Sequence, residues 1–392
     1  MSDTQFDIVV YGATGFTGRL IAEYLSANYG NGQLLSWAMA GRSQAKLESV
    51  RDEMGLPADT PLIVANSNDE ASMQAMVDST KLVLTTVGPY QIYGSLLVGL
   101  CAASGTDYVD LCGESVWMRH MIDAHQETAK KSGARIVFSC GFDSIPSDLG
   151  VFRLQQLAKQ KTGDTCRKVN GRVRSMQGTF SGGTAYSLNA SVKAAKSDPD
   201  IYKLAINPYS LVPGFEGVQQ PNGDQVMYSE ALKSWVAPFV MAAINTRNVH
   251  RSNALLGHFY GEDFTYDEMM LTGDGEKGEA IAKHLATTNP MGGPDAPKPG
   301  EGPSKAEREA GFYDILFIGE TTNGDSMALS VKGDRDPGYG STCKMISESA
   351  ICLVKDAQDT PSGVWTTAPA MGDKLIKRLE ENAGLTFTLE TA

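Results

Sequence analysis

The N-terminal part of the chain alternates between short apolar runs and longer segments with helical periodicity. The first run, Phe6–Tyr11, is rich in β-branched residues and fits a buried strand, and a helical pattern follows it from Thr17 to about Tyr29. Further runs with strand character lie at 34–40, 62–65, 82–86, 108–111 and 135–139, separated by helical patterns at 44–54, 69–78, 91–104 and 115–132. This alternation predicts an α/β fold, a Rossmann-type doubly wound parallel sheet.

The pattern changes after about Gly163. We expect a strand at 169–176, a helix at 182–196 and mostly helix in the apolar segment 225–249. Two alternating runs, 313–321 and 326–332, flank Asn323-Gly324, a dipeptide typical of tight hairpins. This part is therefore predicted to be α+β with an antiparallel sheet. The last predicted elements are helices at 339–356 and 371–382, the second with Gly384 as its C-cap.

Residues 289–311 are unusually rich in turn-forming residues, with five prolines and five glycines. No packed element fits that composition. We expect a flexible surface loop, and a mobile lid over a site is the alternative.

The overall charge limits the partners of the protein. A net charge of −12 argues against nucleic acid, because phosphate binding needs a positive surface. The most hydrophobic later run, 235–244, is ten residues long, whereas a bilayer span needs about 20. A buried helix is the simplest interpretation, and contact with a membrane surface or with another copy of the chain is the alternative.

Neither metal ligation nor export is indicated. None of the six cysteines forms a C-x-x-C pair, and the five histidines show no ligand spacing, so we expect no metal site. The first residues lack the basic and apolar regions of an export signal. We therefore expect a cytoplasmic protein, with the membrane periphery as the alternative.

A glycine-rich turn ends the first predicted strand, with the sequence Gly12-Ala13-Thr14-Gly15-Phe16-Thr17-Gly18. The chain must leave a buried strand, approach a pyrophosphate closely and enter a helix packed on the sheet, and glycine permits all three. The free N–H groups and positive dipole end of the helix would hold the phosphate charge. A helix cap with extra glycines is the simpler alternative, but the context of strand, turn and helix favours a dinucleotide site.

The end of the second strand indicates which nucleotide binds. NAD-binding domains usually have Asp or Glu there, but this chain has Arg42 and Ser43, with Lys46 one helical turn further on. A guanidinium matches the geometry of a phosphate, whereas a surface arginine at a helix start would oppose the dipole. We therefore expect NADP(H) rather than NAD, bound at its 2′-phosphate by these residues.

Two more strand ends are expected to contact the cofactor, because ligands of such folds lie at the carboxyl ends of the strands. Val87-Gly88-Pro89-Tyr90 follows the fourth strand, where Gly-Pro lets the backbone pass close to the nicotinamide ribose. Tyr90 would face the nicotinamide ring or the substrate. Asn66, after the third strand, would contact the adenine.

Five motifs occur together in a fixed order: GATGFTG (12–18), AGRS (40–43), VGPY (87–90) with Gly94, GTDYVDLCGE (105–114) and SCGFDSIPSDLG (139–150). A closing segment around 363–379 accompanies them. Together they resemble the saccharopine dehydrogenase-like oxidoreductases, and most closely the subgroup of trans-acting enoyl reductases of mycobacteria.

The resemblance implies a Rossmann domain interrupted in sequence by a catalytic or dimerisation domain. The corresponding division is an NADP-binding domain at 1–160, an α+β domain at 161–338 and a segment at 339–392 that returns to the Rossmann domain. It also implies NADPH, a lipid-like substrate, a homodimer and peripheral membrane contact. Trans-acting enoyl reductases reduce a C=C bond of polyketide-derived lipid chains, whereas saccharopine reductases act on an amino-acid C=N bond. The residues leave this choice open.

Candidate catalytic groups are few. None of the fourteen tyrosines has a lysine four residues later, so the Tyr-x-x-x-Lys dyad is absent, and so is a G-x-S-x-G elbow. Asp143 or Ser144 is expected to cap a helix, with a site role for Asp143 as the alternative. The segment Ser181–Tyr186 could bound the substrate pocket, with Tyr186 as proton donor, and Tyr90 is a third candidate. We expect an NADPH-dependent oxidoreductase, and a non-catalytic NADP-binding sensor remains the alternative.

Overall fold

The first of two sheets is parallel and has seven strands, six from the N-terminal part of the chain and one from its C-terminal part. The computed structural model describes residues 4–30, 32, 34–179, 182–288 and 302–390. The strands lie in the order β13-β6-β5-β4-β1-β2-β3, and every adjacent pair is parallel. Their bounds are β1 (Phe6–Tyr11), β2 (Trp37–Gly41), β3 (Leu62–Val64), β4 (Thr80–Thr85), β5 (Asp107–Val109), β6 (Arg135–Val137) and β13 (Gly363–Trp365). The prediction of a doubly wound parallel sheet is confirmed.

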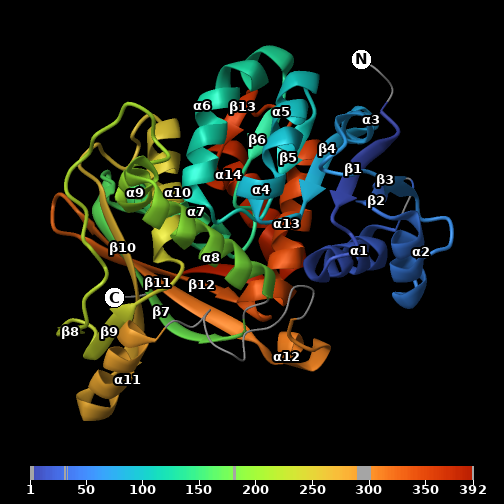
Figure 1. Ribbon diagram of the computed structural model, residues 1–392. Helices are drawn as coiled ribbons and strands as arrows, with labels where there is room; N and C mark the ends of the chain where they lie inside the picture. The colour runs from blue at the N-terminus through green and yellow to red at the C-terminus, as the bar shows by residue number, and fades with distance from the viewer. Residues whose placement is uncertain (1–3, 31, 33, 180–181, 289–301, 391–392) are drawn as a thin grey trace.

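Helices pack against this sheet in two layers (Figure 1). One layer contains α3 (Glu70–Asp78), α5 (Ser95–Ser104) and α6 (Ser115–Ser132), and the short α4 (Tyr90–Tyr93) precedes it. The other contains α1 (Phe16–Tyr29), α2 (Gln44–Glu53) and α13 (Thr342–Ile351). Because α13 comes from the C-terminal part of the chain and packs on α1, β4 and β5, both ends of the sequence build this half.

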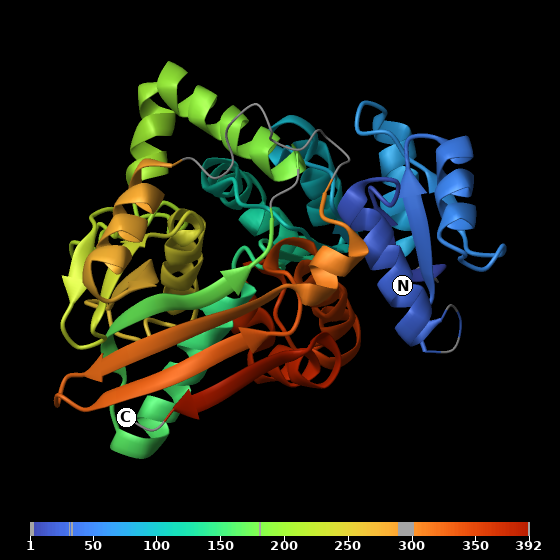
Figure 2. The same ribbon diagram turned by 90° about the horizontal axis from the view of Figure 1, so that it is seen from below.

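A second, mixed sheet lies beside the first (Figures 1 and 2). Its order is β14-β12-β11-β7-β10-β9-β8, in which β7 and β10 are parallel and the other pairs antiparallel. The bounds are β7 (Cys166–Gln177), β8 (Met227–Ser229), β9 (Ser234–Pro238), β10 (Thr265–Gly273), β11 (Phe312–Thr321), β12 (Ser326–Gly333) and β14 (Leu385–Glu390). The predicted hairpin is β11–β12, and Gly324 in its turn has a φ of 86°.

Three helices occupy the space between the sheets. Helix α7 (Ile145–Thr162) packs on β11 and β12 of the second sheet and on α10 (Ala242–Leu255) and α14 (Thr367–Arg378). The buried hydrophobic residues of both sheets belong to one cluster, so this interface is part of the core. The other helical segments are α8 (Gly182–Ser197), α9 (Pro199–Ile206), α11 (Gly275–Thr287), α12 (Lys305–Ala310), and the π-helical turns η1 (Pro337–Ser341), η2 (Cys352–Asp356) and η3 (Leu379–Ala383).

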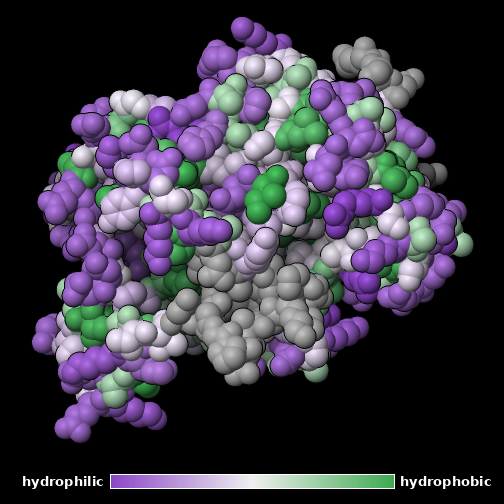
Figure 3. Space-filling model, viewed as in Figure 1, coloured by the Kyte–Doolittle hydropathy of each residue, from purple (hydrophilic) through white to green (hydrophobic). Residues whose placement is uncertain are grey.

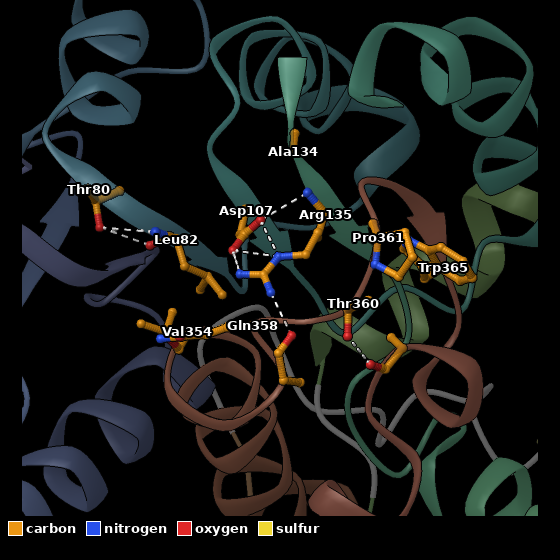
Figure 4. Close-up of polar contacts among 12 residues, drawn as sticks. Thr80, Leu82, Asp107, Ala134, Arg135, Val354, Gln358, Thr360, Pro361 and Trp365 are labelled. Carbon is orange, nitrogen blue, oxygen red and sulfur yellow. Dashed lines mark hydrogen bonds and ion pairs between the residues drawn. The ribbon is translucent and has the colours of Figure 1, made fainter. Parts of the chain in front are cut away.

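Polar contacts hold the C-terminal segment against the first sheet. Arg135 on β6 forms an ion pair with Asp107 on β5 and donates to the carbonyl of Ala357 at 2.7 Å (Figure 4). Lys355 donates to Asp7 at 2.8 Å, at the start of β1. These contacts place β13 beside β6 although more than two hundred residues separate them in sequence.

Several predictions of secondary structure are wrong. Residues 225–249 are not mostly helical, since β8 and β9 lie there and α10 begins only at Ala242. The run 235–244 is therefore no buried helix: it starts in β9, which pairs with β10, and of its residues only Ala243 is exposed. Such an apolar run cannot be assigned by periodicity alone, and a partner strand decided it.

The segment 289–311 was expected to contain no packed element. Residues 289–301 lie outside the described residues, but Lys305–Ala310 forms α12. A capping box between Ser304 and Glu307 explains the helix, because it satisfies two backbone N–H groups at its start. The last predicted helix begins earlier than expected, at Thr367, and Gly384 ends the helical segment in the left-handed conformation as predicted.

In the part of the chain that the structure describes, no helix is long and apolar enough to cross a membrane. On the face of the molecule seen in Figure 3, hydrophobic residues form small, separate patches among polar ones.

Candidate functional site

The glycine turn after β1 is shaped for a close ligand. Gly12 has a φ of 92°, and a Cβ on it would lie 2.7 Å from Thr86 Oγ1 and 2.8 Å from Val87 Cγ2. A Cβ on Gly18 would lie 2.2 Å from the carbonyl oxygen of Gly12, so α1 packs directly on the turn. Neither position has room for a side chain, which is the arrangement that a dinucleotide turn requires.

The N-terminus of α1 is prepared for an anion. Gly15 is the N-cap, and no side chain makes a capping hydrogen bond there. The first turn, Phe16, Thr17 and Gly18, also contains no acidic residue. The helix dipole and the N–H groups of this turn therefore face the space above Ala13 and Thr14 without a carboxylate of their own to neutralise them. These residues fit a pyrophosphate.

The residues expected at the 2′-phosphate lie together. A hollow of about 380 Å³ is lined by Thr14, Arg42, Ser43, Lys46 and Asn66. Ser43 also caps α2, since its hydroxyl accepts from the N–H of Lys46 at 3.4 Å. Arg42 and Lys46 are exposed, and neither forms an ion pair with another described residue. Two unpaired cations in one hollow suit a phosphate next to the adenine end of the cofactor.

A second cavity, of about 310 Å³, adjoins the glycine turn and lies between the two sheets. One wall comes from loops at the carboxyl ends of the first sheet, with Thr86, Gly88 and Tyr90 after β4 and Glu114 after β5. The opposite wall is apolar and comes from the second part of the chain: Met176, Phe239, Val240, Met241 and Ile244, with Pro337, Gly338 and Tyr339 beside Thr17. The cavity is therefore where the strand-end rule places a ligand of this fold.

The predicted contact residue Tyr90 lines this cavity, but its hydroxyl is engaged. The hydroxyl accepts from the N–H of Leu111 at 3.1 Å and lies 3.4 Å from the carbonyl of Thr85, and its ring packs on Trp117. Burial raises the pKa of Tyr90 well above its usual value. These contacts argue against Tyr90 as a proton donor and favour a positioning role.

Two acids of the motif at 105–114, Asp110 and Glu114, hold neighbouring loops by hydrogen bonds. The carboxylate of Glu114 accepts from the N–H groups of Tyr90 at 2.8 Å and Gln91 at 2.9 Å, which fixes the turn after β4. Asp110 is completely buried and accepts from the N–H groups of Cys112 and Ser139 and from the hydroxyl of Tyr108. Both acids were missed by the sequence reasoning, although two closely spaced acids after a buried strand were a visible signal.

Asp143 lies in the wall of the cavity, in the loop between β6 and α7. The expectation that Asp143 or Ser144 caps the helix is wrong: Ser144 occupies the N-cap position, but no side chain makes a capping hydrogen bond. The Ser144 hydroxyl instead accepts from Asn248 Nδ2 at 2.8 Å, so a contact with α10 displaced the local cap. Burial raises the pKa of Asp143 to about 7.

Of the segment 181–186, which was expected to bound the cavity, the structure describes the side chain of Tyr186 alone. Ser181 lies outside the described residues, and Gly182 already begins α8. The side chain of Tyr186 is 51% exposed and does not line the cavity, which α8 reaches through Ser187 and Ser191 instead. This placement argues against Tyr186 as proton donor.

Comparison with known proteins identifies the N-terminal third of the chain. Residues 8–137 match the family model described as the saccharopine dehydrogenase NADP binding domain. This match confirms NADP(H) as the cofactor, in agreement with the hollow around Arg42.

Relatives extend over nearly the whole chain. A protein of Mycobacterium tuberculosis, named as a candidate trans-acting enoyl reductase, is 41% identical over 402 residues, which cover 96% of this chain and 95% of the relative. The trans-acting enoyl reductase of Mycobacterium ulcerans is 37% identical over 406 residues, 96% of each chain.

Solved structures share the fold. Apo saccharopine dehydrogenase (L-Glu forming) from Saccharomyces cerevisiae has a TM-score of 0.54 at 10% identity, covering 99% of this chain and 100% of that one. The homospermidine synthase of Legionella pneumophila, in complex with NAD, has a TM-score of 0.56 at 8% identity, covering 98% and 92%. At such identities these structures show the fold alone.

Proposed function

We propose that this chain, which belongs to the family of trans-acting enoyl reductases and is an NADP-dependent oxidoreductase, reduces a C=C bond conjugated to a carbonyl in an apolar, lipid-type acyl substrate. The observation that carries the proposal is the lining of the cavity between the sheets.

That lining contains no cation. Among the described residues around the cavity there is no Lys, Arg or His, and the charged side chains are those of Glu114 and Asp143. An amino-acid substrate brings a carboxylate into the site, and burying a carboxylate without a cation or several donors is costly. The cavity therefore disfavours an amino-acid substrate and favours an uncharged chain packed against Phe239, Met241 and Ile244.

NADPH, when bound, supplies a hydride from its nicotinamide ring. The protein holds the cofactor at its two phosphate positions: the glycine turn with α1 binds the pyrophosphate, and Arg42 with Lys46 binds the 2′-phosphate. Gly88 and Tyr90 line the cavity next to the turn and would contact the nicotinamide end of the cofactor. The apolar wall excludes water and aligns the double bond with the cofactor, which is most of what hydride transfer needs from a protein.

The test is an NADPH oxidation assay with two substrate classes. We expect turnover with trans-2-enoyl thioesters, with kcat/KM rising as the acyl chain lengthens and fills the apolar wall. We expect none with a 2-oxo acid and an amino acid offered together as precursors of an imine. Turnover with the amino-acid pair alone would overturn the proposal, and NADPH binding without turnover of any enoyl substrate would favour the sensor alternative.

A further inference from the structure

We propose that Asp143 is the catalytic proton donor of this reductase, and that the loop 139–145 fixes its backbone while leaving its carboxyl group free in the cavity. This inference rests on the proposed function, because it assigns the second half of the same reaction.

The backbone on both sides of Asp143 is pinned. The N–H of Ser144 donates to the carbonyl of Ser139 at 3.1 Å, and the N–H of Ile145 donates to the carbonyl of Gly141 at 2.8 Å. The N–H of Phe142 donates to Thr342 Oγ1 at 3.0 Å. A Cβ on Gly141 would lie 2.6 Å from Leu111 Cδ2, so the loop fits its surroundings closely.

Helix α10, in the second part of the chain, makes one more hydrogen bond to this loop. Asn248 on α10 donates to the hydroxyl of Ser144 at 2.8 Å, and both residues are buried. The same helix contributes Ile244 to the apolar wall. Helix α10 thus contacts the residue next to Asp143 and also contributes to the apolar wall, which helps to fix the position of Asp143 relative to a substrate, as a pre-organised catalytic group requires.

The carboxyl group of Asp143 makes no hydrogen bond or ion pair with the described residues around it. Asp110 and Glu114 stand on the neighbouring loop, and each accepts at least two hydrogen bonds from the surrounding backbone. Asp143, by contrast, has no hydrogen bond or ion pair with another described residue, and its Oδ2 lies over Gly113, 3.6 Å from where a Cβ would stand. Burial raises the pKa of Asp110 to about 7 as well, but Asp110 is not among the described residues that line the cavity, and both oxygens of Glu114 accept from backbone, so Asp143 is the one of these three acids with a carboxyl group free to face a substrate.

The surroundings favour the protonated form of this carboxyl group. The titratable groups that line the cavity with Asp143 are Glu114, Tyr90 and Tyr339, and the thiol of Cys112 lies below the same loop. None of them is a cation, and α10 contributes only Ala243 and Ile244 to the described lining. Burial without a compensating positive charge favours the neutral acid and raises the pKa of Asp143 to about 7.

The other candidates are weaker donors. The Tyr90 hydroxyl is held by the backbone of Leu111 and Thr85, and Tyr186 does not reach the cavity. The hydroxyls of Ser187, Ser191 and Thr342 are much weaker acids than a carboxylic acid at neutral pH.

The reaction balances with one proton. The hydride and its electron pair add to the β-carbon, the C=C π pair moves to form an enolate, and NADPH is oxidised to NADP⁺. The O–H bond of Asp143 breaks as a C–H bond forms at the α-carbon, which leaves the Asp143 carboxylate. After the product leaves, the Asp143 carboxylate takes up one proton from bulk solvent, so that the overall reaction consumes one H⁺.

The test compares the pH dependence of kcat in the wild type and in Asp143→Asn, with a trans-2-enoyl thioester and saturating NADPH. For the wild type we expect kcat to fall above about pH 7, because the donor must be protonated. For Asp143→Asn we expect kcat to fall at least about 100-fold and to lose this pH dependence. Asp143→Glu keeps an acid in place and is expected to recover part of kcat together with the pH dependence.

Asp59→Asn, at an exposed position, is the matched control and is expected to behave like the wild type. The Kd for NADPH, measured for each variant, shows whether the site has folded, and an unchanged value is expected. If the wild type reduces the enoyl thioester and Asp143→Asn does so equally well, Asp143 is not the donor. If the wild type reduces no enoyl thioester, the proposed function itself fails.

Discussion

Replacing Asp143 by Asn should make the folded protein more stable, and increasingly so as the pH rises. In the folded state the pKa of Asp143 is about 7, and in the unfolded chain it returns to about 3.8. Between these values the folded state holds a proton that the unfolded state has lost. The free energy of unfolding is therefore unaffected by this group below about pH 3.8, falls as the pH rises toward 7, and stays reduced above it.

The magnitude follows from the same two values. At about 1.4 kcal/mol for each pH unit between them, the charge on Asp143 would cost the folded protein at most about 4 kcal/mol at pH 8 and about 2 kcal/mol at pH 5; both costs are reduced because the side chain is half-buried and water in the cavity screens its charge. Asn has nearly the same shape and no charge. The gain from Asp143→Asn should thus be about twice as large at pH 8 as at pH 5.

Urea unfolding at the two pH values measures this difference. We expect the midpoint of Asp143→Asn to exceed that of the wild type, with an unchanged slope, and the gap to widen at pH 8. Equal midpoints at both pH values would refute the reasoning, because they would mean that the carboxyl group is solvated or paired in the folded state. A loss of kcat together with a gain in stability is the combination expected of a buried catalytic acid.

Three further predictions concern the cofactor site and the ion pairs of Asp7. Arg42→Ala should raise the Kd for NADPH at least about 10-fold and leave that for NADH nearly unchanged, because the guanidinium meets the 2′-phosphate; equal losses by calorimetry would exclude that contact. Gly18→Ala should abolish NADPH binding and lower stability by about 1–3 kcal/mol, since its Cβ would lie 2.2 Å from the Gly12 carbonyl oxygen; a thermal shift with NADPH equal to that of the wild type would contradict this. Ion pairs with Lys81 and Lys355 lower the pKa of Asp7 to about 2, although burial opposes them. Asp7→Asn should therefore cost about 1 kcal/mol at pH 7, since both lysines are partly exposed, and this cost should disappear as the pH falls from 3.8 through 2. A cost that is the same at pH 7 and in acid would point to lost packing instead.

Local sequence determined the cofactor half of the site. The glycine turn, the absence of an acid after β2 and the cations Arg42 and Lys46 all act through neighbouring backbone, so the strand, turn and helix that carry them are visible in about forty residues. The same holds for the β11–β12 hairpin, because the Asn323-Gly324 turn and the alternating apolar and polar residues beside it both predict a hairpin. In each case the residues that must meet are close together in the chain.

Tertiary structure alone decided the cavity between the sheets. Residues 235–238 form a strand because they pair with β10, whereas α10 begins at Ala242. The contact between Asn248 and the Ser144 hydroxyl joins α10 to the loop that carries Asp143. The cavity joins residues near 90, 114, 143, 240 and 339, and no local pattern records that they meet. Burial, and with it the raised pKa of Asp143, is a property of this assembly rather than of the sequence around the residue, because desolvation depends on which distant segments exclude water from it.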